Sequence, residues 1–141
     1  FYNQIGQKKV FALKENILKI NPDIIVEAHD IKLDNINFFN IYKNCNIIIE
    51  AFDLAEMKQM IIEEVLDKMP KTPIIAGIGI AGWGNNNNIK TKNIGNLYLC
   101  GDNTSETSDE TPPLAPKVCI AANMQANQAL EILLTKDNYE D

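Results

Sequence analysis

The sequence predicts an α/β domain with a Rossmann-like, doubly wound and mostly parallel sheet that also contains an antiparallel hairpin. Continuous apolar runs at 46–52 and 72–82 are typical of parallel strands covered on both faces. Segments of helical periodicity alternate with these runs, as in sheets whose strands are joined by crossover helices. The length of 141 residues fits a single domain spanning 1–141.

Two helices and a strand are predicted before the first apolar run. Apolar residues recur at spacings of three and four over 7–23, which predicts a helix that Pro22 ends. The β-branched start of 24–33 predicts a strand. Asp34 is a favourable N-cap and predicts a short helix over 34–44.

The second half is predicted to complete the sheet. An amphipathic helix over 55–69 joins the two apolar runs. Four asparagines at 85–88 predict a turn, since Asn tolerates left-handed dihedrals. Segments 88–92 and 96–100 predict a hairpin. The polar, acidic stretch 101–116 predicts a loop, and the alanine-rich stretch 117–134 a final helix that lies close to the sheet.

Composition excludes several classes of function. The net charge of −6 argues against nucleic acid as a partner. The longest apolar run, 74–82, is too short and glycine-rich to span a membrane, and no signal peptide is visible, so a cytoplasmic protein is expected. Cys45, Cys100 and Cys119 form no C-x-x-C pair, so zinc is not expected.

Three glycines at 77, 79 and 82 have the spacing of a G-x-G-x-x-G motif. A phosphate-binding motif of this kind follows a strand and opens a helix, but here an asparagine turn follows. We therefore expect no phosphate site at these glycines. They are interpreted as positions where another backbone or a bound peptide approaches closely.

Asp53 directly follows the run that ends at 52, and two interpretations remain open. It fits the N-cap of the next helix in a capping box with Glu56 at N3. It also fits a ligand-binding carboxylate, because ligands of open α/β sheets bind beyond the carboxyl ends of the strands. A carboxylate has enough acceptor positions for both roles.

The order of the motifs resembles a known superfamily. The segments concerned are IGQKKVFALKENILKINPDI at 5–24, NIIIEAFDLAEMK at 46–58, PIIAGIGIAGWGN at 73–85, IKTKNIGNLYLCGD at 89–102 and LAPKVCIAANMQANQALEILL at 114–134. Together they resemble the superfamily of ubiquitin-activating enzymes, and most of all its ThiF-type members. Those proteins use ATP to adenylate the carboxyl terminus of the sulfur carrier ThiS in thiamine biosynthesis.

The resemblance implies site residues and partners. Lys9 would be catalytic by neutralising ATP phosphate charge. Asp53 would be catalytic by binding Mg²⁺. Lys58 stands where relatives bind phosphate with arginine, although a solvated helix face is the favoured interpretation. The expected partners are a ThiS-like sulfur carrier, whose Gly-Gly tail would lie under the loop 101–117, and a second copy of the chain in a homodimer.

The resemblance also implies that parts of the family site are absent. The chain has no arginine, starts at Phe1 and lacks a glycine-rich phosphate loop, so we expect the C-terminal two-thirds of such a domain, inactive alone. A catalytic role for Cys119 is not expected, because we predict it to be buried, and His29 is expected to be a strand residue. Trp83 fits either a partner contact or hairpin packing. The alternative functions are a non-catalytic module that binds a ubiquitin-like carrier and an NAD-dependent oxidoreductase.

Overall fold

The computed structural model describes residues 1–137 and divides into two compact units. The first comprises Phe1–Leu33 and the second begins at Asp34. The single domain over 1–141 stays a prediction.

The first unit is built on one α-helix. A short 3₁₀ turn, η1 (Tyr2–Gln4), precedes α1 (Lys9–Ile20), so the helix predicted over 7–23 is confirmed with shorter ends. The two elements are joined by Gln4, whose side-chain amide exchanges hydrogen bonds with that of Asn16, at 2.9 and 3.1 Å. The amphipathic pattern buries no residue of α1 completely.

The strand predicted over 24–33 is wrong. This segment has neither helical nor strand structure, and Ile25 is 92% exposed. A β-strand exists only when a neighbour supplies a hydrogen-bonded ladder. No such neighbour pairs with these residues in the described part of the chain, so β-branched composition alone did not produce a strand. His29 is therefore not a strand residue; its Nε2 lies 3.7 Å from a carboxylate oxygen of Glu27.

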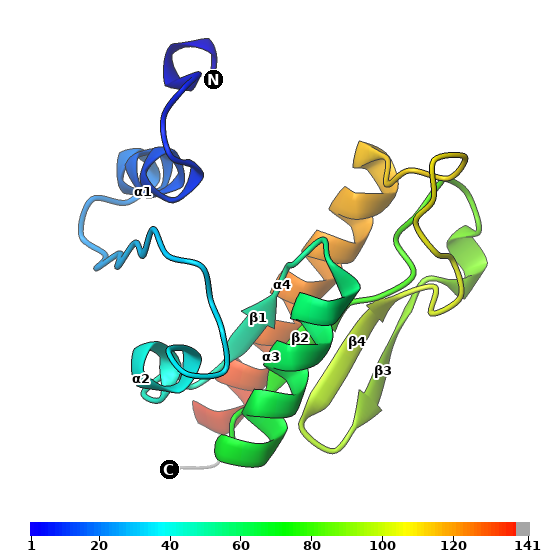
Figure 1. Cartoon of the computed structure of the whole chain (residues 1–141). Helices are drawn as coiled ribbons and strands as arrows, with labels where there is room; N and C mark the ends of the chain where they lie inside the picture. The colour runs from blue at the N-terminus through cyan, green and yellow to red at the C-terminus, as the bar shows by residue number, and fades with distance from the viewer. Residues whose placement is uncertain (138–141) are drawn as a thin grey trace. The chain divides into compact units, whose positions relative to one another are not determined.

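The second unit contains the sheet, which confirms the predicted α/β class (Figure 1). Within the described residues its order is β1-β2-β4-β3. The strands are β1 (Ile48–Glu50), β2 (Ile74–Gly77), β3 (Lys90–Ile94) and β4 (Leu97–Gly101). β1, β2 and β4 are mutually parallel, and β3 pairs with β4 as an antiparallel hairpin.

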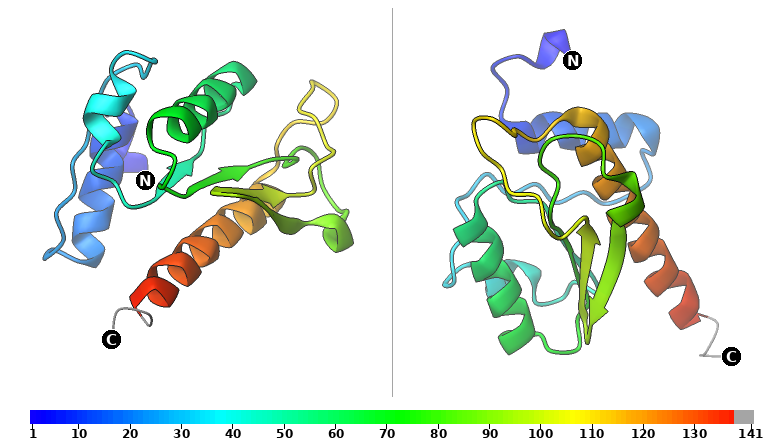
Figure 2. Two further views of the ribbon diagram at one scale, coloured as in Figure 1. Left: turned by 90° about the horizontal axis from the view of Figure 1, so that it is seen from below. Right: turned by 90° about the vertical axis from the view of Figure 1, so that its right-hand side faces the viewer.

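Three α-helices and the short 3₁₀ turn η2 (Asn86–Asn88) lie in the described part of this unit. The α-helices are α2 (Phe38–Tyr42), α3 (Ala55–Lys68) and α4 (Ala115–Asp137). α3 and α4 cover opposite faces of the sheet (Figure 2). Asp34 does not cap α2, whose N-cap is Asn37. Instead, its Oδ1 accepts hydrogen bonds from the Ile36 and Asn37 amides at 2.9 and 2.8 Å, which closes the turn before the helix.

α4 packs on the sheet through a narrow, periodic face. Four buried residues recur every four positions, at Lys117, Ala121, Gln125 and Ala129, and buried Ile132 follows three positions later. Ala129 and Ile132 form one apolar cluster with Ile75 of β2 and Cys100 of β4. The small alanines allow the close approach that the sequence predicted. Ala122 and Ala126, predicted with them, are exposed on the other side of the helix.

Candidate functional site

The parallel strands place their carboxyl ends at one edge of the sheet. β1 ends at Glu50, β2 at Gly77 and β4 at Gly101. Polar residues follow two of them, with Asp53 after β1 and Asp102 after β4. Ligands of open α/β sheets bind beyond this edge, so these segments form the candidate site of the second unit.

Asp53 is exposed and does not cap a helix. α3 begins at Ala55, its N-cap is Leu54, and no side chain bonds to the free amides of the first turn. The predicted capping box is wrong because the helix starts one residue later than the pattern indicates, so Glu56 occupies N2 instead of N3. The Asp53 carboxylate is thereby left in solvent at the end of β1.

Lys9 lies in the first unit, as the first residue of α1, and is exposed. The neighbouring Lys8 is the N-cap residue, and its Nζ lies 3.2 Å from Asp30 Oδ2. A cation in the first turn of a helix is disfavoured by the helix dipole. An anion bound there would offset that repulsion. The first unit thus exposes Lys9, and the second exposes Asp53.

Lys58 is partly buried and has a charged partner within the chain. Its ammonium group forms an ion pair with Glu50, the last residue of β1. The Glu50 side chain is fully buried, and that of Lys58 is 23% exposed. A buried carboxylate requires a partner of this kind, since an unpaired charge in the interior is very costly. The expected solvated helix face is therefore corrected in part: Lys58 neutralises a buried carboxylate, and its contact with phosphate stays a prediction.

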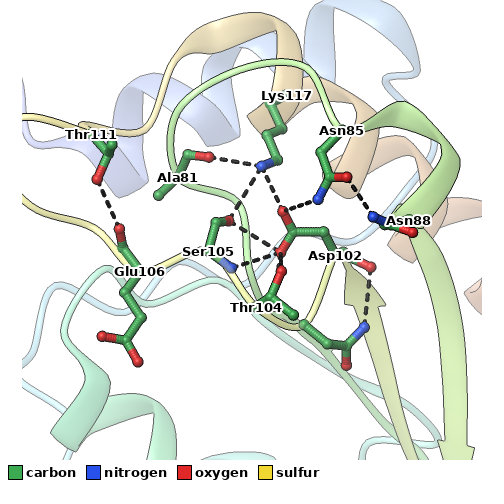
Figure 3. A network of polar contacts seen from close by, with 11 residues as sticks. Ala81, Asn85, Asn88, Asp102, Thr104, Ser105, Glu106, Thr111 and Lys117 are labelled. Carbon is green, nitrogen blue, oxygen red and sulfur yellow. Dashed lines mark hydrogen bonds and ion pairs between the residues drawn. The ribbon is translucent and has the colours of Figure 1, made fainter.

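A second buried ion pair joins Asp102 to Lys117 of α4, as Figure 3 shows. Lys117 Nζ lies 2.8 Å from Asp102 Oδ2 and 2.8 Å from the carbonyl oxygen of Ala81. It also donates to Ser105 Oγ at 3.2 Å. The lysine thus has three acceptors that come from two loops and hold the start of α4 against both.

The other oxygen of Asp102 organises the loop that follows it. Oδ1 accepts hydrogen bonds from the backbone amides of Thr104 and Ser105 at 2.9 and 2.8 Å and from their hydroxyl groups at 3.2 and 3.1 Å. Asn85 Nδ2 donates to Oδ2 at 3.3 Å. Burial opposes the charge of Asp102, but the bonds from Lys117 and the loop outweigh it and hold the pKa of this carboxyl far below its usual range.

The glycines of 77–84 make room for this network. A Cβ on Gly79 would lie 2.1 Å from Asp102 Oδ1 and 2.5 Å from the Asn103 amide nitrogen. A Cβ on Gly101 would lie 1.6 Å from the carbonyl oxygen of Ile78. No α-helix opens at Gly82; the next helical element is the short 3₁₀ turn η2 (Asn86–Asn88). Close approach is thus confirmed at Gly79, whereas a Cβ at Gly77 or Gly82 would meet its nearest neighbour at an ordinary 3.6 or 4.0 Å.

The cysteines differ from the prediction in one respect. Cys119 is exposed, so its predicted burial is wrong, because α4 buries the opposite face. Cys100 is buried, and burial raises the pKa of its thiol against the opposing hydrogen bond from Thr91. In the described part of the chain, no three His, Cys, Asp or Glu side chains are placed to share a metal ion.

Two surface features lie outside the predicted site residues. Trp83 is 72% exposed, which rules out packing in the hairpin core. An open hollow of about 510 Å³ adjoins the hairpin and the second half of α4, lined by Thr91, Asn93, Tyr98, Gln128, Glu131, Ile132 and Thr135. It contains none of Lys9, Asp53 and Lys58.

Across residues 1–137, no helix combines the length and apolarity that crossing a bilayer requires.

Sequence reasoning missed Glu50, Asp102, Lys117 and Gln125, although two signals pointed to three of them. Glu50 interrupts an apolar run at a strand end, where a charge needs a reason. Lys117 and Gln125 share the four-residue period of Ala121 and Ala129, which places polar residues on the buried face of α4. Their partners lie far away in sequence, so the pattern alone could not supply them.

Comparisons with known proteins identify relatives of this chain. The model of the ThiF family matches residues 2–140. The adenylyltransferase and sulfurtransferase UBA4 of Kluyveromyces lactis is 24% identical over 146 residues, which cover 97% of this chain and 32% of that protein. UBA4 of Candida albicans is 25% identical over 145 residues, covering 96% and 32%. The chain thus spans about a third of the length of these curated relatives.

Solved structures share the fold. The structure of Escherichia coli tRNA N6-threonylcarbamoyladenosine dehydratase, TcdA, in complex with ATP matches with a TM-score of 0.77 at 14% identity, covering 100% of this chain and 70% of that one. The complex of the same enzyme with AMP matches with a TM-score of 0.76 at 16% identity, covering 96% and 68%. Together with the family match over nearly all residues, the sheet order and the strand-end site lead to one assignment: the chain belongs to the ThiF family.

Proposed function

We propose that the protein carrying this chain adenylates the carboxyl terminus of a ubiquitin-like carrier protein with ATP. The carrier carboxylate attacks the α-phosphorus of ATP, an acyl-adenylate forms, and pyrophosphate leaves. The observation that carries the proposal is the exposed, uncapped carboxylate of Asp53 at the end of β1, in a chain of the ThiF family. The names of relatives support it, since they include adenylyltransferases and an enzyme that binds ATP.

Adenylation needs no nucleophilic side chain, so the work of this chain is positioning and charge stabilisation. In the proposal, Lys9 offsets negative charge on the phosphates during the attack. Asp53 supplies a carboxylate beside them. Lys58 has no direct part, because Glu50 holds its charge. This replaces the cofactor-binding role that the resemblance implied for Lys58.

Asp53 fits a magnesium ion by its chemistry. Mg²⁺ is usually held in such sites by one or two carboxylates together with substrate phosphates and water. Asp53 is exposed and no helix amide occupies its oxygens, so it can serve as that carboxylate. When bound, the ion would supply positive charge to the ATP phosphates. The donor set is too small for a metal held by protein groups alone.

The loop that starts at Asp102 is proposed to lie over the carrier tail. Its first residues are fixed by Asp102, whereas Glu106, Asp109 and Glu110 are exposed. Within the class of ubiquitin-like carriers, we propose a ThiS-like sulfur carrier of thiamine biosynthesis, on the resemblance of 73–102 and 114–134 to ThiF-type proteins. A cytoplasmic homodimer completes the proposal.

A second candidate is a binding module that holds a ubiquitin-like carrier without activating it. One observation favours it: residues 1–141 contain no arginine and no glycine-rich turn leading into a helix, the groups that usually hold nucleotide phosphates. This chain alone is expected to bind ATP weakly under either hypothesis.

ATP–pyrophosphate exchange separates the two candidates. The protein is assayed with Mg²⁺-ATP and labelled pyrophosphate, with a ThiS-like carrier, with the same carrier lacking its terminal Gly-Gly, and with no carrier. Adenylation predicts exchange only with the intact carrier. Carrier binding without exchange would instead establish the binding module, and exchange that ignores the Gly-Gly deletion would contradict the proposed substrate.

A further inference from the structure

Glu50 is a fully buried carboxylate three residues before Asp53. It stands at the last position of β1, where its neighbour Ile48 on the same face is also buried. The interior of a sheet normally holds apolar side chains at such a position. A charge that is kept there at the cost of desolvation calls for a specific role.

Each acceptor group of Glu50 has a separate partner. Oε1 accepts the backbone N–H of Phe52, which lies between Glu50 and Asp53. Oε2 forms the ion pair with Lys58, in the second turn of α3. The main-chain oxygen of Glu50 accepts Gln125 Nε2 at 2.9 Å, and the same amide donates to the Ile75 oxygen at 3.1 Å.

These contacts fix the turn from β1 to α3 from two sides. Gln125 of α4 holds the end of β1 beside β2 on one face of the sheet. On the other face, Lys58 holds the Glu50 carboxylate, which in turn holds the Phe52 amide. Asp53, the next residue, has no cap bond of its own. Its position is therefore set by the backbone that Glu50 restrains.

We propose that Glu50 is a positioning residue, which, through the Phe52 amide, directs the Asp53 carboxylate beyond the strand end. Lys58 acts with it by neutralising its buried charge. The inference rests on the proposed function, in which Asp53 meets the magnesium nucleotide. Groups that orient a metal ligand typically change metal affinity about 10–100-fold when they are lost.

A purely stabilising role makes a different prediction. It would require only that the buried space be filled and the charges be balanced. Two double variants separate these roles, because both remove the two opposite charges together. Glu50→Gln with Lys58→Met keeps an oxygen that can accept the Phe52 N–H. Glu50→Leu with Lys58→Met fills a similar volume but has no acceptor.

The experiment measures ATP–pyrophosphate exchange against Mg²⁺ concentration in both variants of the protein carrying this chain. Circular dichroism and thermal melting first establish that both are folded. The Leu variant is expected to need at least about tenfold more Mg²⁺ for half-maximal exchange, whereas the Gln variant stays within about twofold of the parent. Equal Mg²⁺ dependence in the two variants would overturn the proposal.

Hydrogen exchange at the Phe52 amide, followed by NMR in the same samples, keeps the inference testable apart from activity. The Phe52 amide is expected to exchange at least about tenfold faster in the Leu variant than in the Gln variant, because it has lost its buried acceptor. If the parent protein catalyses no ATP–pyrophosphate exchange, the proposed function fails, and the positioning role is then judged from the amide alone. Equal protection of the Phe52 amide in the two variants would contradict that role.

Discussion

Lys117 Nζ lies 2.8 Å from Asp102 Oδ2, in a pair whose side chains are only 6% and 1% exposed. The pair connects the first turns of α4 with the end of β4, and the Ala81 oxygen adds the loop after β2. Two segments that border the strand-end site are therefore held by one lysine. Removing either partner leaves the other as an unpaired buried charge, so the pair should contribute measurably to the free energy of unfolding.

Lys117→Met is expected to destabilise the chain by about 3–5 kcal/mol, because Asp102 is left as an uncompensated buried charge. Urea unfolding followed by circular dichroism measures the change. Lys71→Met is the matched control: Lys71 is exposed, and its loss should stay within about 0.5 kcal/mol. Equal stability of the two variants would show that the buried pair does not hold the loops.

Asp102 makes the free energy of unfolding depend on pH in the acidic range. Its pKa is lower in the folded chain than in the unfolded one, where it is about 3.9. Its contribution is therefore complete above the unfolded pKa and decreases as the pH falls through that value toward the folded pKa. The difference in unfolding free energy between the parent and Asp102→Asn should be largest above about pH 5 and shrink toward about pH 2. Parallel stability curves would contradict this contribution.

Gly79 and Gly84 offer a matched test of close approach. Both have positive φ, at +65° and +67°, but a Cβ meets Asp102 Oδ1 at 2.1 Å only at Gly79, and nothing within 4 Å at Gly84. Gly84→Ala should lower the free energy of unfolding by about 1–3 kcal/mol, from the strain of its positive φ alone. Gly79→Ala should lower it by about 1–3 kcal/mol more, because its Cβ crowds the Asp102 carboxylate. Chemical denaturation measures the stability of both variants, and equal losses of stability would contradict crowding at Gly79.

Cys119 and Cys100 should differ in reactivity. Cys119 is exposed, whereas Cys100 is buried and the pKa of its thiol is raised by burial. Iodoacetamide at pH 8 is expected to modify Cys119 rapidly and Cys100 only after unfolding, because the thiolate is the reactive form. Mass spectrometry of timed samples gives the order. Cys119→Ser should remove the fast adduct, and early modification of Cys100 would contradict its burial.

Much of the fold could be predicted because most elements around the sheet have local sequence patterns. Two apolar runs and the helical period of 55–69 gave β1, α3 and β2, and the asparagine turn is confirmed by Asn85 at φ 59°. The strand at 24–33 failed for a non-local reason. Whether a β-branched segment forms a strand depends on a neighbour that pairs with it, which no short window contains.

The site was harder to predict because its contacts depend on small shifts in register. A helix start displaced by one residue removed Asp53 from its cap. Cys119 was expected to be buried, but it lies about 200° around α4 from Lys117, at about 100° per residue. The pairs Glu50–Lys58 and Asp102–Lys117 join positions 8 and 15 residues apart in the chain. Sequence shows such charges but not which of them meet.

The role of Asp53 is tested most directly by ATP–pyrophosphate exchange in Asp53→Asn, measured in the presence of Mg²⁺ and the carrier. Glu56→Gln is the control, since it removes the same charge from an exposed position in the first turn of α3. If Asp53 holds the magnesium nucleotide, Asp53→Asn abolishes exchange while Glu56→Gln keeps it. Normal exchange in folded Asp53→Asn would contradict the proposed site.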